Sequence, residues 1–412
     1  MTMNLREIAS RAKVSIATVS RTINRVPTVR PVVAKRVQKV IDEVGYYPNI
    51  HARALVSGRS RIFGLVVSEI TNPFFPEIAQ AFEDLGAEHK YEILLSSVTN
   101  NPGRPEMAAR RMIELRVDGV AILTFGGEDA LIEAFRQRKV PAVAIDIESS
   151  EPFLKTLHID YQHGIRQAVQ HLAALGHIGI AFVSGPAHLK TALARRIAFQ
   201  ECMHEIGLGV SPEFLIEGDH TMEAGMKAMV ALAAAPVRPS AVICSNDMTA
   251  IGLMREAFEL CLEIPRDLSV VGFDDTHFAQ FTTPPLTTVR MSQAEIARTA
   301  FRALIDSVET QLSRTSREVF TIRTDLVIRG STAIAPDRLR QTAVSIRGLR
   351  QPEARERLDW GYRFHANNCS DFRNTGCFQN PCKRVSPLVH KTTVLAGRRR
   401  NEAAWNLDVA FR

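Results

Sequence analysis

Short apolar runs alternate with amphipathic segments over most of the chain from Arg61 onward. An uninterrupted apolar run indicates a strand buried on both faces, whereas apolar residues three and four apart indicate a helix. The expected strands of the first half are 62–67, 92–97, 119–123 and 141–145, and the expected helices are 75–90, 104–116 and 129–138. This alternation predicts a parallel sheet covered by helices on both faces.

A second series of the same kind follows. The expected helices are 161–175, 190–206, 222–234 and 247–260, and the expected strands are 178–184, 241–245 and 268–273. The pattern therefore predicts two α/β subdomains within residues 61–335. We expect the chain to cross between them near Tyr161, at 289–292 and at 320–323, so that short hinges allow the halves to rotate.

Residues 1–47 have the pattern of three short helices instead. Asn4 and Glu7 have the spacing of a capping box ahead of the first helix. Pro31 fits the first turn of the third helix, which Gly45 is expected to end. An all-α head therefore precedes the α/β region, with residues 48–60 as hinge and linker.

The second of these helices has the features of a DNA-reading helix. Ser15 is placed to cap it, and Val19 and Ile23, four apart, face the core. A helix in the major groove touches base edges with its first turns. The predicted DNA contacts in this helix are Ser15, Ile16, Ala17, Thr18, Ser20 and Arg21, with Arg21 the best candidate for guanine and Ile16 alternatively a core residue.

Charge supports this interpretation of the head. Residues 1–60 contain 11 Lys and Arg against 3 Asp and Glu. A surface that neutralises phosphates needs such an excess of positive charge. A small helical bundle with no DNA contact is the alternative that charge disfavours.

At this point the chain resembles the lactose-repressor (LacI/GalR) family of transcription regulators, on the residues Asn4 to Leu55 and on the alternating α/β pattern to about residue 335. The resemblance implies a helix-turn-helix head and a periplasmic-binding-protein-like sensor. It also implies that the segment 49–57 forms a hinge helix on operator DNA, with Asn49, Ala52 and Leu55 as contacts and Leu55 wedged into a minor-groove step. Leu55 could alternatively be an ordinary buried helix residue. Lys13 departs from the Gly or Asn common in the family's turn.

The resemblance also implies an effector site between the subdomains, outside the carboxyl ends of the strands. Four residues match positions that commonly hold effectors, two match aromatic positions and three match variable positions. The resulting set is Asp146, Arg195, Asn246, Asp274, Phe74, Phe75, Leu189, Thr191 and His220. Carboxylates, amides and a guanidinium suit the hydroxyls of a sugar or sugar derivative. As alternatives, Asp146 and Asp247 could cap helices, and both phenylalanines could be core residues.

The function expected is that of a ligand-responsive repressor, a homodimer or larger assembly on palindromic double-stranded operator DNA, in which effector binding acts allosterically. The alternative is a sugar-binding or sugar-modifying protein whose head mediates oligomerisation. Enzyme motifs such as Gly-x-Ser-x-Gly or a phosphate-binding loop are absent, so we predict no catalysis and no cofactor. Without a signal peptide or a membrane-length apolar run, a cytoplasmic location is expected, with no membrane partner.

Residues 336–412 differ from the rest, with 15 Lys and Arg against 7 Asp and Glu and little apolar periodicity. This composition predicts a basic, disordered extension without a function of its own, and weak DNA affinity from its positive charge is the alternative. His365, Cys369, Cys377 and Cys382 have the number of ligands that zinc needs. They lack a close Cys-x-x-Cys pair, so we predict no metal site.

Overall fold

A computed structural model describes residues 5–23, 27–46, 59–98, 103–126, 129–147, 151–309 and 319–336. The head contains α1 (Leu5–Arg11), α2 (Ile16–Ile23) and α3 (Pro31–Val44). Its core includes Ile8, Val19, Val37 and Ile41. As predicted, Gly45 ends α3 in the left-handed conformation, with φ 58°, and its N–H donates to the Asp42 carbonyl. The predicted cap Asn4 and the extension 337–412 lie outside the described residues.

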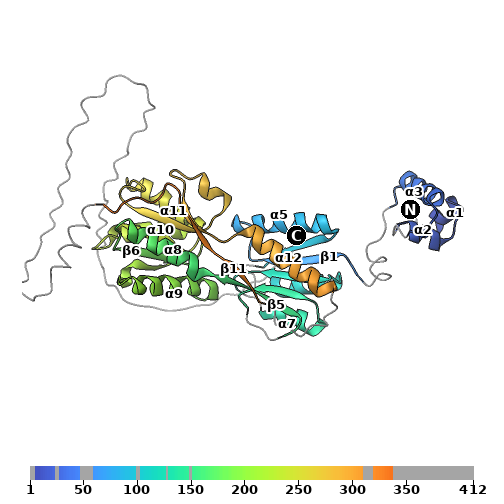
Figure 1. Ribbon diagram of the computed structural model, residues 1–412, viewed down its shortest axis with the longest axis horizontal. Helices are drawn as coiled ribbons and strands as arrows, with labels where there is room; N and C mark the ends of the chain where they lie inside the picture. Colours follow the sequence, from blue (N-terminus) through green and yellow to red (C-terminus); the bar gives the residue numbers. More distant parts are fainter. Residues whose placement is uncertain are drawn as a thin grey trace, which may run out of the picture. The chain divides into compact units, whose positions relative to one another are not determined.

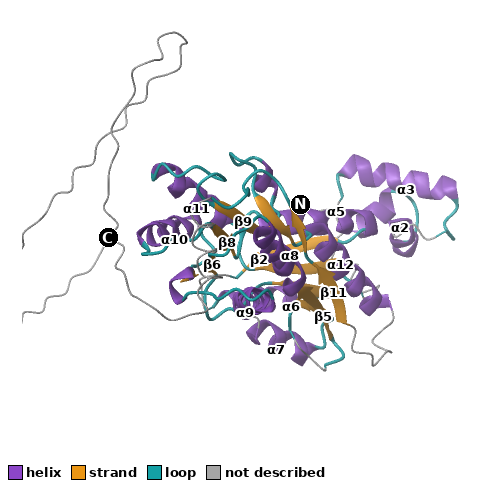
Figure 2. Ribbon diagram, turned by 60° about the vertical axis from the view of Figure 1, so that its left-hand side comes forward, coloured by secondary structure: helices purple, strands orange, loops and turns teal. Residues whose placement is uncertain are grey.

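The first lobe is built on a six-stranded sheet in the order β11-β5-β4-β3-β1-β2, and all its neighbours are parallel. Its strands are β1 (Ile62–Val67), β2 (Glu92–Ser97), β3 (Gly119–Leu123), β4 (Ala142–Ile145), β5 (Leu154–Asp160) and β11 (Val319–Arg323). Figure 2 shows the strands of both sheets in the interior, with helices around them. Apolar runs such as β1 and β3 are almost completely buried, as expected for central parallel strands.

The helices of this lobe are α5 (Phe74–His89), α6 (Arg104–Glu114), α7 (Asp129–Arg138) and α12 (Gln293–Glu309). In Figure 1, α12 lies beside α5, although more than two hundred residues separate them in the sequence. Phe301 of α12 packs edge-on against Phe63 of β1 and Phe82 of α5, at centroid distances of 5.4 and 5.2 Å. The lobe is therefore closed by a late segment of the chain.

The second lobe has a six-stranded sheet in the order β12-β10-β9-β8-β6-β7. Its strands are β6 (Ile180–Ser184), β7 (Leu215–Glu217), β8 (Ala241–Cys244), β9 (Ser269–Asp274), β10 (Thr287–Arg290) and β12 (Asp325–Val327). Its helices are α8 (Tyr161–Ala174), α9 (Lys190–Glu205), α10 (Met222–Ala234), α11 (Asp247–Glu259) and the short η1 (Pro212–Phe214) and η2 (His277–Gln280). Unlike the other described neighbours in this sheet, β12 pairs with β10 in the antiparallel direction.

The expected fold class is confirmed, and the chain crosses between the lobes at the three predicted places. The crossings lie between β5 and α8, between β10 and α12, and between β11 and β12. Buried Thr324 ties two of them together: its hydroxyl donates to the Asp160 carbonyl (2.6 Å) and accepts from the Gly164 N–H (3.0 Å). A Cβ on Gly164 would overlap both Thr324 Oγ1 and Val289 Cγ1 of the remaining crossing.

No helix among the described segments is both long enough and apolar enough to cross a membrane.

Candidate functional site

The helix α2 presents the predicted DNA-contacting face to solvent. The Thr18 N–H donates to the Ser15 hydroxyl oxygen (3.2 Å), which satisfies a donor of the first turn, as a cap should. Ile16 is 43% exposed, so the alternative of a core residue is wrong for it. The other residues of the predicted set are exposed Ser15, Ala17 and Arg21 and half-buried Thr18 and Ser20.

The turn before α2 contains Lys13 in the left-handed conformation, with φ 50°. This is the position at which the sequence departs from the Gly or Asn common in the resembled family, and a side chain there carries some backbone strain. The predicted hinge contacts Asn49, Ala52 and Leu55 lie outside the described residues, as do His365, Cys369, Cys377 and Cys382.

In the sensor, the predicted effector residues come from both lobes and gather where strands end. Asp146 follows β4 and Asp274 ends β9, while Asn246 is the cap of α11. Leu189 is the residue before α9, which carries Thr191 and Arg195. The Leu189 side chain lies against Gly126 of the first lobe, so close that a Cβ on this glycine would lie 2.5 Å from Leu189 Cδ2. The residues therefore converge as open α/β sheets predict.

Arg195 is the centre of this arrangement. It is 2% exposed, and its guanidinium lies over the rings of Phe273 (4.4 Å), Tyr161 (5.0 Å) and Phe125 (5.5 Å). Nη1 donates to the Ser245 carbonyl (2.6 Å), whereas Nε and Nη2 have no partner. Buried donors without partners are rare in proteins, and a ligand is one way to satisfy them.

The two adjacent carboxylates after β9 have different environments. Asp275 is paired with Arg329 (2.6 Å) and Arg290 (2.7 Å). Asp274 is 3% exposed with φ 110°, and its Oδ1 has no partner. Burial raises the pKa of Asp274 well above its usual range, with Arg195 acting against the shift. Of the pair, Asp274 is therefore the one available to a ligand.

Asp146 belongs to a small network between the lobes. Its carboxylate accepts from the Tyr161 hydroxyl (2.7 Å) and from the Ile159 N–H (2.8 Å), and the His158 Nδ1 lies 3.3 Å away. Burial raises the pKa of Asp146. The alternative that it caps a helix is wrong, because β5 and not a helix follows it.

Asp247 does not cap a helix either. It accepts from the Thr276 N–H (2.7 Å), the Thr276 hydroxyl (3.0 Å) and the Thr288 hydroxyl (2.5 Å), which hold the lobe together. Burial raises the pKa of Asp247 to about 7. The cap of α11 is instead the neighbouring asparagine.

Asn246 and His220 occupy the second lobe's side of the cleft. Asn246 Oδ1 accepts from the Thr249 N–H (2.9 Å), and its Nδ2 donates to the His220 carbonyl (2.9 Å), so its amide already has partners. His220 lies against Gly185 and 3.3 Å from the Ser245 hydroxyl. Burial and the Arg195 charge lower the pKa of His220 to about 3, so the imidazole is neutral at pH 7. Thr191 is buried, and its hydroxyl has no partner.

Phe74 and Phe75 are 1% and 2% exposed and belong to the hydrophobic core of the sensor. The alternative core placement is therefore correct for both. They also touch the cleft indirectly, since both rings contact Phe125, at 5.6 and 5.5 Å, which in turn lies beside Arg195.

Sequence reasoning missed the ring residues around Arg195. Phe125, Tyr161 and Phe273 each lie just after a strand or at its end, the same positional signal that identified the polar residues. That signal was used for the polar residues and for Phe74 and Phe75, and not for these three. It could have placed the three rings near the cleft, although not around Arg195.

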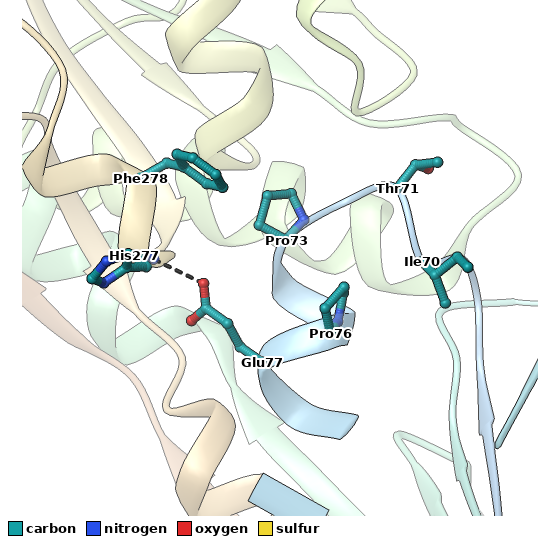
Figure 3. Close-up of a pocket in the computed structure, with 7 residues that line it drawn as sticks. All are labelled: Ile70, Thr71, Pro73, Pro76, Glu77, His277 and Phe278. Carbon is teal, nitrogen blue, oxygen red and sulfur yellow. Dashed lines mark hydrogen bonds between the residues drawn. The ribbon is translucent and has the colours of Figure 1, made fainter. Parts of the chain in front are cut away.

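A shallow groove of about 600 Å³ lies where the lobes meet. Figure 3 shows it between the start of α5, with Ile70, Thr71, Pro73 and Pro76, and the η2 residue Phe278. One Glu77 oxygen accepts from the His277 N–H (2.9 Å) and thereby joins the lobes. Within the described ranges, no cluster of His, Cys, Asp or Glu has the arrangement of a metal site.

Comparisons with known proteins agree with this architecture. Residues 4–49 match the family "Bacterial regulatory proteins, lacI family", and residues 169–332 match the family "Periplasmic binding protein-like domain". The transcriptional repressor CytR of Escherichia coli strain K12 is 34% identical over 336 residues, which span 81% of this chain and 97% of the relative. Catabolite control protein A of Priestia megaterium is 33% identical over 306 residues, which span 74% of this chain and 92% of the relative.

Solved structures give the same result. A lac repressor dimer bound to operator and the anti-inducer ONPF has a TM-score of 0.73 at 25% identity, covering 81% of this chain and 100% of that one. A complex of the regulator CelR with cellobiose has a TM-score of 0.60 at 27% identity, covering 80% and 99%. The head and the two-lobed sensor are both present, and the matches cover nearly the full length of the relatives. Together these findings show that this chain belongs to the LacI family of bacterial transcriptional regulators.

Proposed function

We propose that the protein is a dimeric repressor whose affinity for a palindromic operator is controlled by a small effector, a sugar or sugar derivative, held between the two lobes. The chain then divides into a DNA-binding head (1–47), a hinge (48–60), an effector-binding and dimerisation domain (61–335) and a basic extension (336–412). It acts by binding and not by catalysis, in the cytoplasm, where operator DNA is found.

Arg195 carries this proposal. Two of its nitrogen atoms and an oxygen of Asp274 are buried without partners at the junction of the lobes. An effector that satisfies them would favour the arrangement in which the lobes contact each other. The effector residues in the proposal are Phe74, Phe75, Asp146, Leu189, Thr191, Arg195, His220, Asn246 and Asp274. Asn246 acts through the Thr249 N–H and the His220 carbonyl, which its amide binds, and the two phenylalanines act through Phe125.

For the operator, the proposed readers are Ser15, Ile16, Ala17, Thr18, Ser20 and Arg21 in the major groove, and Asn49, Ala52 and Leu55 at the hinge. Exposure of Ile16 and Arg21 on the first turns of α2 supports the major-groove assignment. In a dimer, movement between lobes changes the separation of two heads and so their fit to two half-sites. Coupling of this kind is reciprocal, so an effector that weakens operator binding binds the operator complex less tightly.

The experiment is selection of DNA from a random duplex pool by the purified full chain, alone and with a panel of sugars and sugar derivatives. Recovery of a palindrome, and its loss or gain with one panel member, is the expected result. The proposal is wrong if no sequence is enriched at any salt concentration, because nonspecific phosphate contacts alone enrich none. The oligomerisation head would then be the better interpretation.

A further inference from the structure

Three helices of the first lobe end in the same way, each with a cation in the left-handed conformation. Lys90 follows α5 with φ 60°, Arg116 follows α6 with φ 53°, and Lys139 follows α7 with φ 53°. In each case the N–H of this residue and the N–H of the next one donate to carbonyls at the end of the helix. Glycine is the residue that such helix ends favour, because a side chain is strained at positive φ.

The second lobe provides an internal comparison. Its helices α8, α9 and α11 end with the same pair of hydrogen bonds, but the left-handed residues there are Gly176, Gly207 and Cys261. A positive side chain at the C-terminus of a helix interacts favourably with the helix dipole, and this benefit is available in both lobes. The dipole therefore does not explain why the cations belong to the first lobe.

These cations lie along one edge of the first sheet. Lys90, Arg116 and Lys139 precede the strands β2, β3 and β4 by two or three residues, and Arg61 directly precedes β1. The strands are parallel neighbours in the order β4-β3-β1-β2, so their amino ends meet at the same edge, about 5 Å apart. One cation therefore lies at the start of each strand, and the four residues form a basic row.

Cations outnumber carboxylates at this edge. All four side chains of the basic row are exposed, and none forms an ion pair with another described residue. Arg59 and Arg138 add two further cations. Glu114 pairs with Arg110 (2.8 Å). The other acidic residues there are Glu88, Glu92, Asp118 and Glu309. The edge therefore presents unpaired positive side chains to solvent.

The chain from the head enters the sensor at this same edge. The described part of the head ends at Tyr46, and the sensor begins with Arg59 and Ser60, just before β1. The intervening residues 47–58 span at most about 45 Å when fully extended. The opposite edge, where the carboxyl ends of the strands lie, faces the cleft. DNA bound to the head is therefore tethered to the edge that carries the basic row.

We propose that the basic row is a second DNA-contact surface, which binds backbone phosphates of the operator without reading its sequence. Separate, flexible cations suit a line of phosphates, which needs neutralisation and no defined pocket. DNA is favoured over an acidic protein, because the head already brings DNA to this edge. The inference rests on the proposed binding of operator DNA by the head, and it adds a sequence-independent contribution from the sensor.

The test combines Lys90→Gly, Arg116→Gly and Lys139→Gly in the full chain. Glycine suits left-handed positions, so this row variant should fold at least as well as the unmodified chain. Its affinity is measured for the palindrome that operator selection recovers and for an unrelated duplex of similar length, between about 50 and 200 mM salt. We expect at least about tenfold weaker binding of both duplexes and a shallower salt dependence, because each lost phosphate contact releases about one counterion fewer.

The matched control removes three exposed cations of the second lobe, through Lys227→Gln, Arg238→Gln and Arg266→Gln combined, and should bind both duplexes normally. Equal weakening in both variants overturns the inference, since net charge alone would explain it. An unchanged salt dependence in the row variant overturns it as well. If the glycine variant does not fold, glutamine at the same three positions replaces it.

Operator selection with the unmodified chain reports on the proposed function separately. If a palindrome is recovered and the row variant binds it normally, the second surface is wrong and the proposed function stands. If no palindrome is recovered, the unrelated duplex still measures the salt dependence of the row variant, so the two failures remain distinguishable.

Discussion

Arg195 and Asp274 show how single residues of the cleft are held ready for a ligand at the expense of stability. Arg195 Nε and Nη2 and Asp274 Oδ1 lack hydrogen bonds, and each such atom costs the folded chain about 1 to 3 kcal/mol. Cation–π contacts with three rings offset part of this cost for Arg195. An effector that supplies the missing bonds should therefore raise the thermal stability of the protein as well as occupy the cleft.

Replacement of Arg21 by alanine should relax operator specificity at one base pair of each half-site. Arg21 is exposed on α2, and a bidentate contact to guanine contributes about 1 to 3 kcal/mol of discrimination. Competition binding with operators changed one base pair at a time measures the effect. Uniform weakening at every sequence would instead identify Arg21 as a phosphate contact.

His220 predicts a specific loss of stability in acid. Its pKa is about 3 in the folded chain against the usual 6.5, so the unfolded chain takes up the proton first as the pH falls. Between pH 7 and pH 5 this group should lower the free energy of unfolding by about 2 kcal/mol.

Urea unfolding of His220→Gln at both pH values checks this expectation, because the variant should lose that part of the pH dependence. His204→Gln, at an exposed position of α9, is the control and should keep it. An identical pH dependence in all three proteins would show that His220 is not a buried neutral imidazole.

At the scale of elements, the helices and the central strands followed from the sequence because their signals are local. The strand β1 is one apolar run, and α3 has a proline at its start and a glycine at its end. In contrast, β5 was not predicted, because exposed His158 and half-buried Lys155 and Asp160 interrupt its apolar pattern. It lies between β4 and β11, and β11 is 159 or more residues away in the sequence.

The candidate site was predicted in part for the same reason. The polar residues at strand ends could be identified from the sequence and the family resemblance, but the rings around Arg195 could not be assigned to it. Phe125, Tyr161 and Phe273 meet at one side chain only through the packing of two lobes. Likewise, the local sequence does not show which of Asp274 and Asp275 is free for a ligand, because the partners of Asp275, Arg290 and Arg329, come from later segments.

Replacement of Gly164 by alanine should destabilise the junction of the lobes. Alanine is the better helix former by about 1 kcal/mol, so helix propensity alone predicts a gain in α8. Its Cβ would overlap Val289 and Thr324, and overpacking costs about 1 to 3 kcal/mol.

Urea unfolding should show a net loss for Gly164→Ala. Gly209→Ala is the matched control, since a Cβ there meets no atom within 4 Å. A gain in stability at Gly164 would mean that the three crossings tolerate separation, and the packing argument for the hinge would be wrong.

At the scale of the whole molecule, the two lobes contact each other in the cleft and again at the groove. The first contact uses Arg195 on Phe125 and Leu189 beside Gly126, and the second is the bond from the His277 N–H to Glu77. Both contacts belong to the arrangement in which the lobes meet. Their energies therefore add to the preference for that arrangement over one with separated lobes.

Removal of the Glu77 carboxylate should shift this preference. We expect Glu77→Ala to weaken effector binding about fivefold, the equivalent of about 1 kcal/mol for one partly exposed hydrogen bond. At one fixed effector concentration, the operator affinity of this variant should lie closer to its effector-free value than that of the unmodified chain does. Glu77→Gln retains an acceptor for the His277 N–H and should bind effector almost normally; equal weakening in both variants would argue for a role of the charge.

The strand β11 also has a consequence for how the protein is made. It pairs with β5, and α12 covers the same lobe, although the rest of that lobe ends at Asp160. During translation, the first lobe therefore lacks its last strand and the helix that covers one apolar face until α12 and β11 have been made. Exposed apolar surface associates readily with other chains, so nascent chains that stop before Gln293 should aggregate or require chaperones, while chains released after Val327 should not.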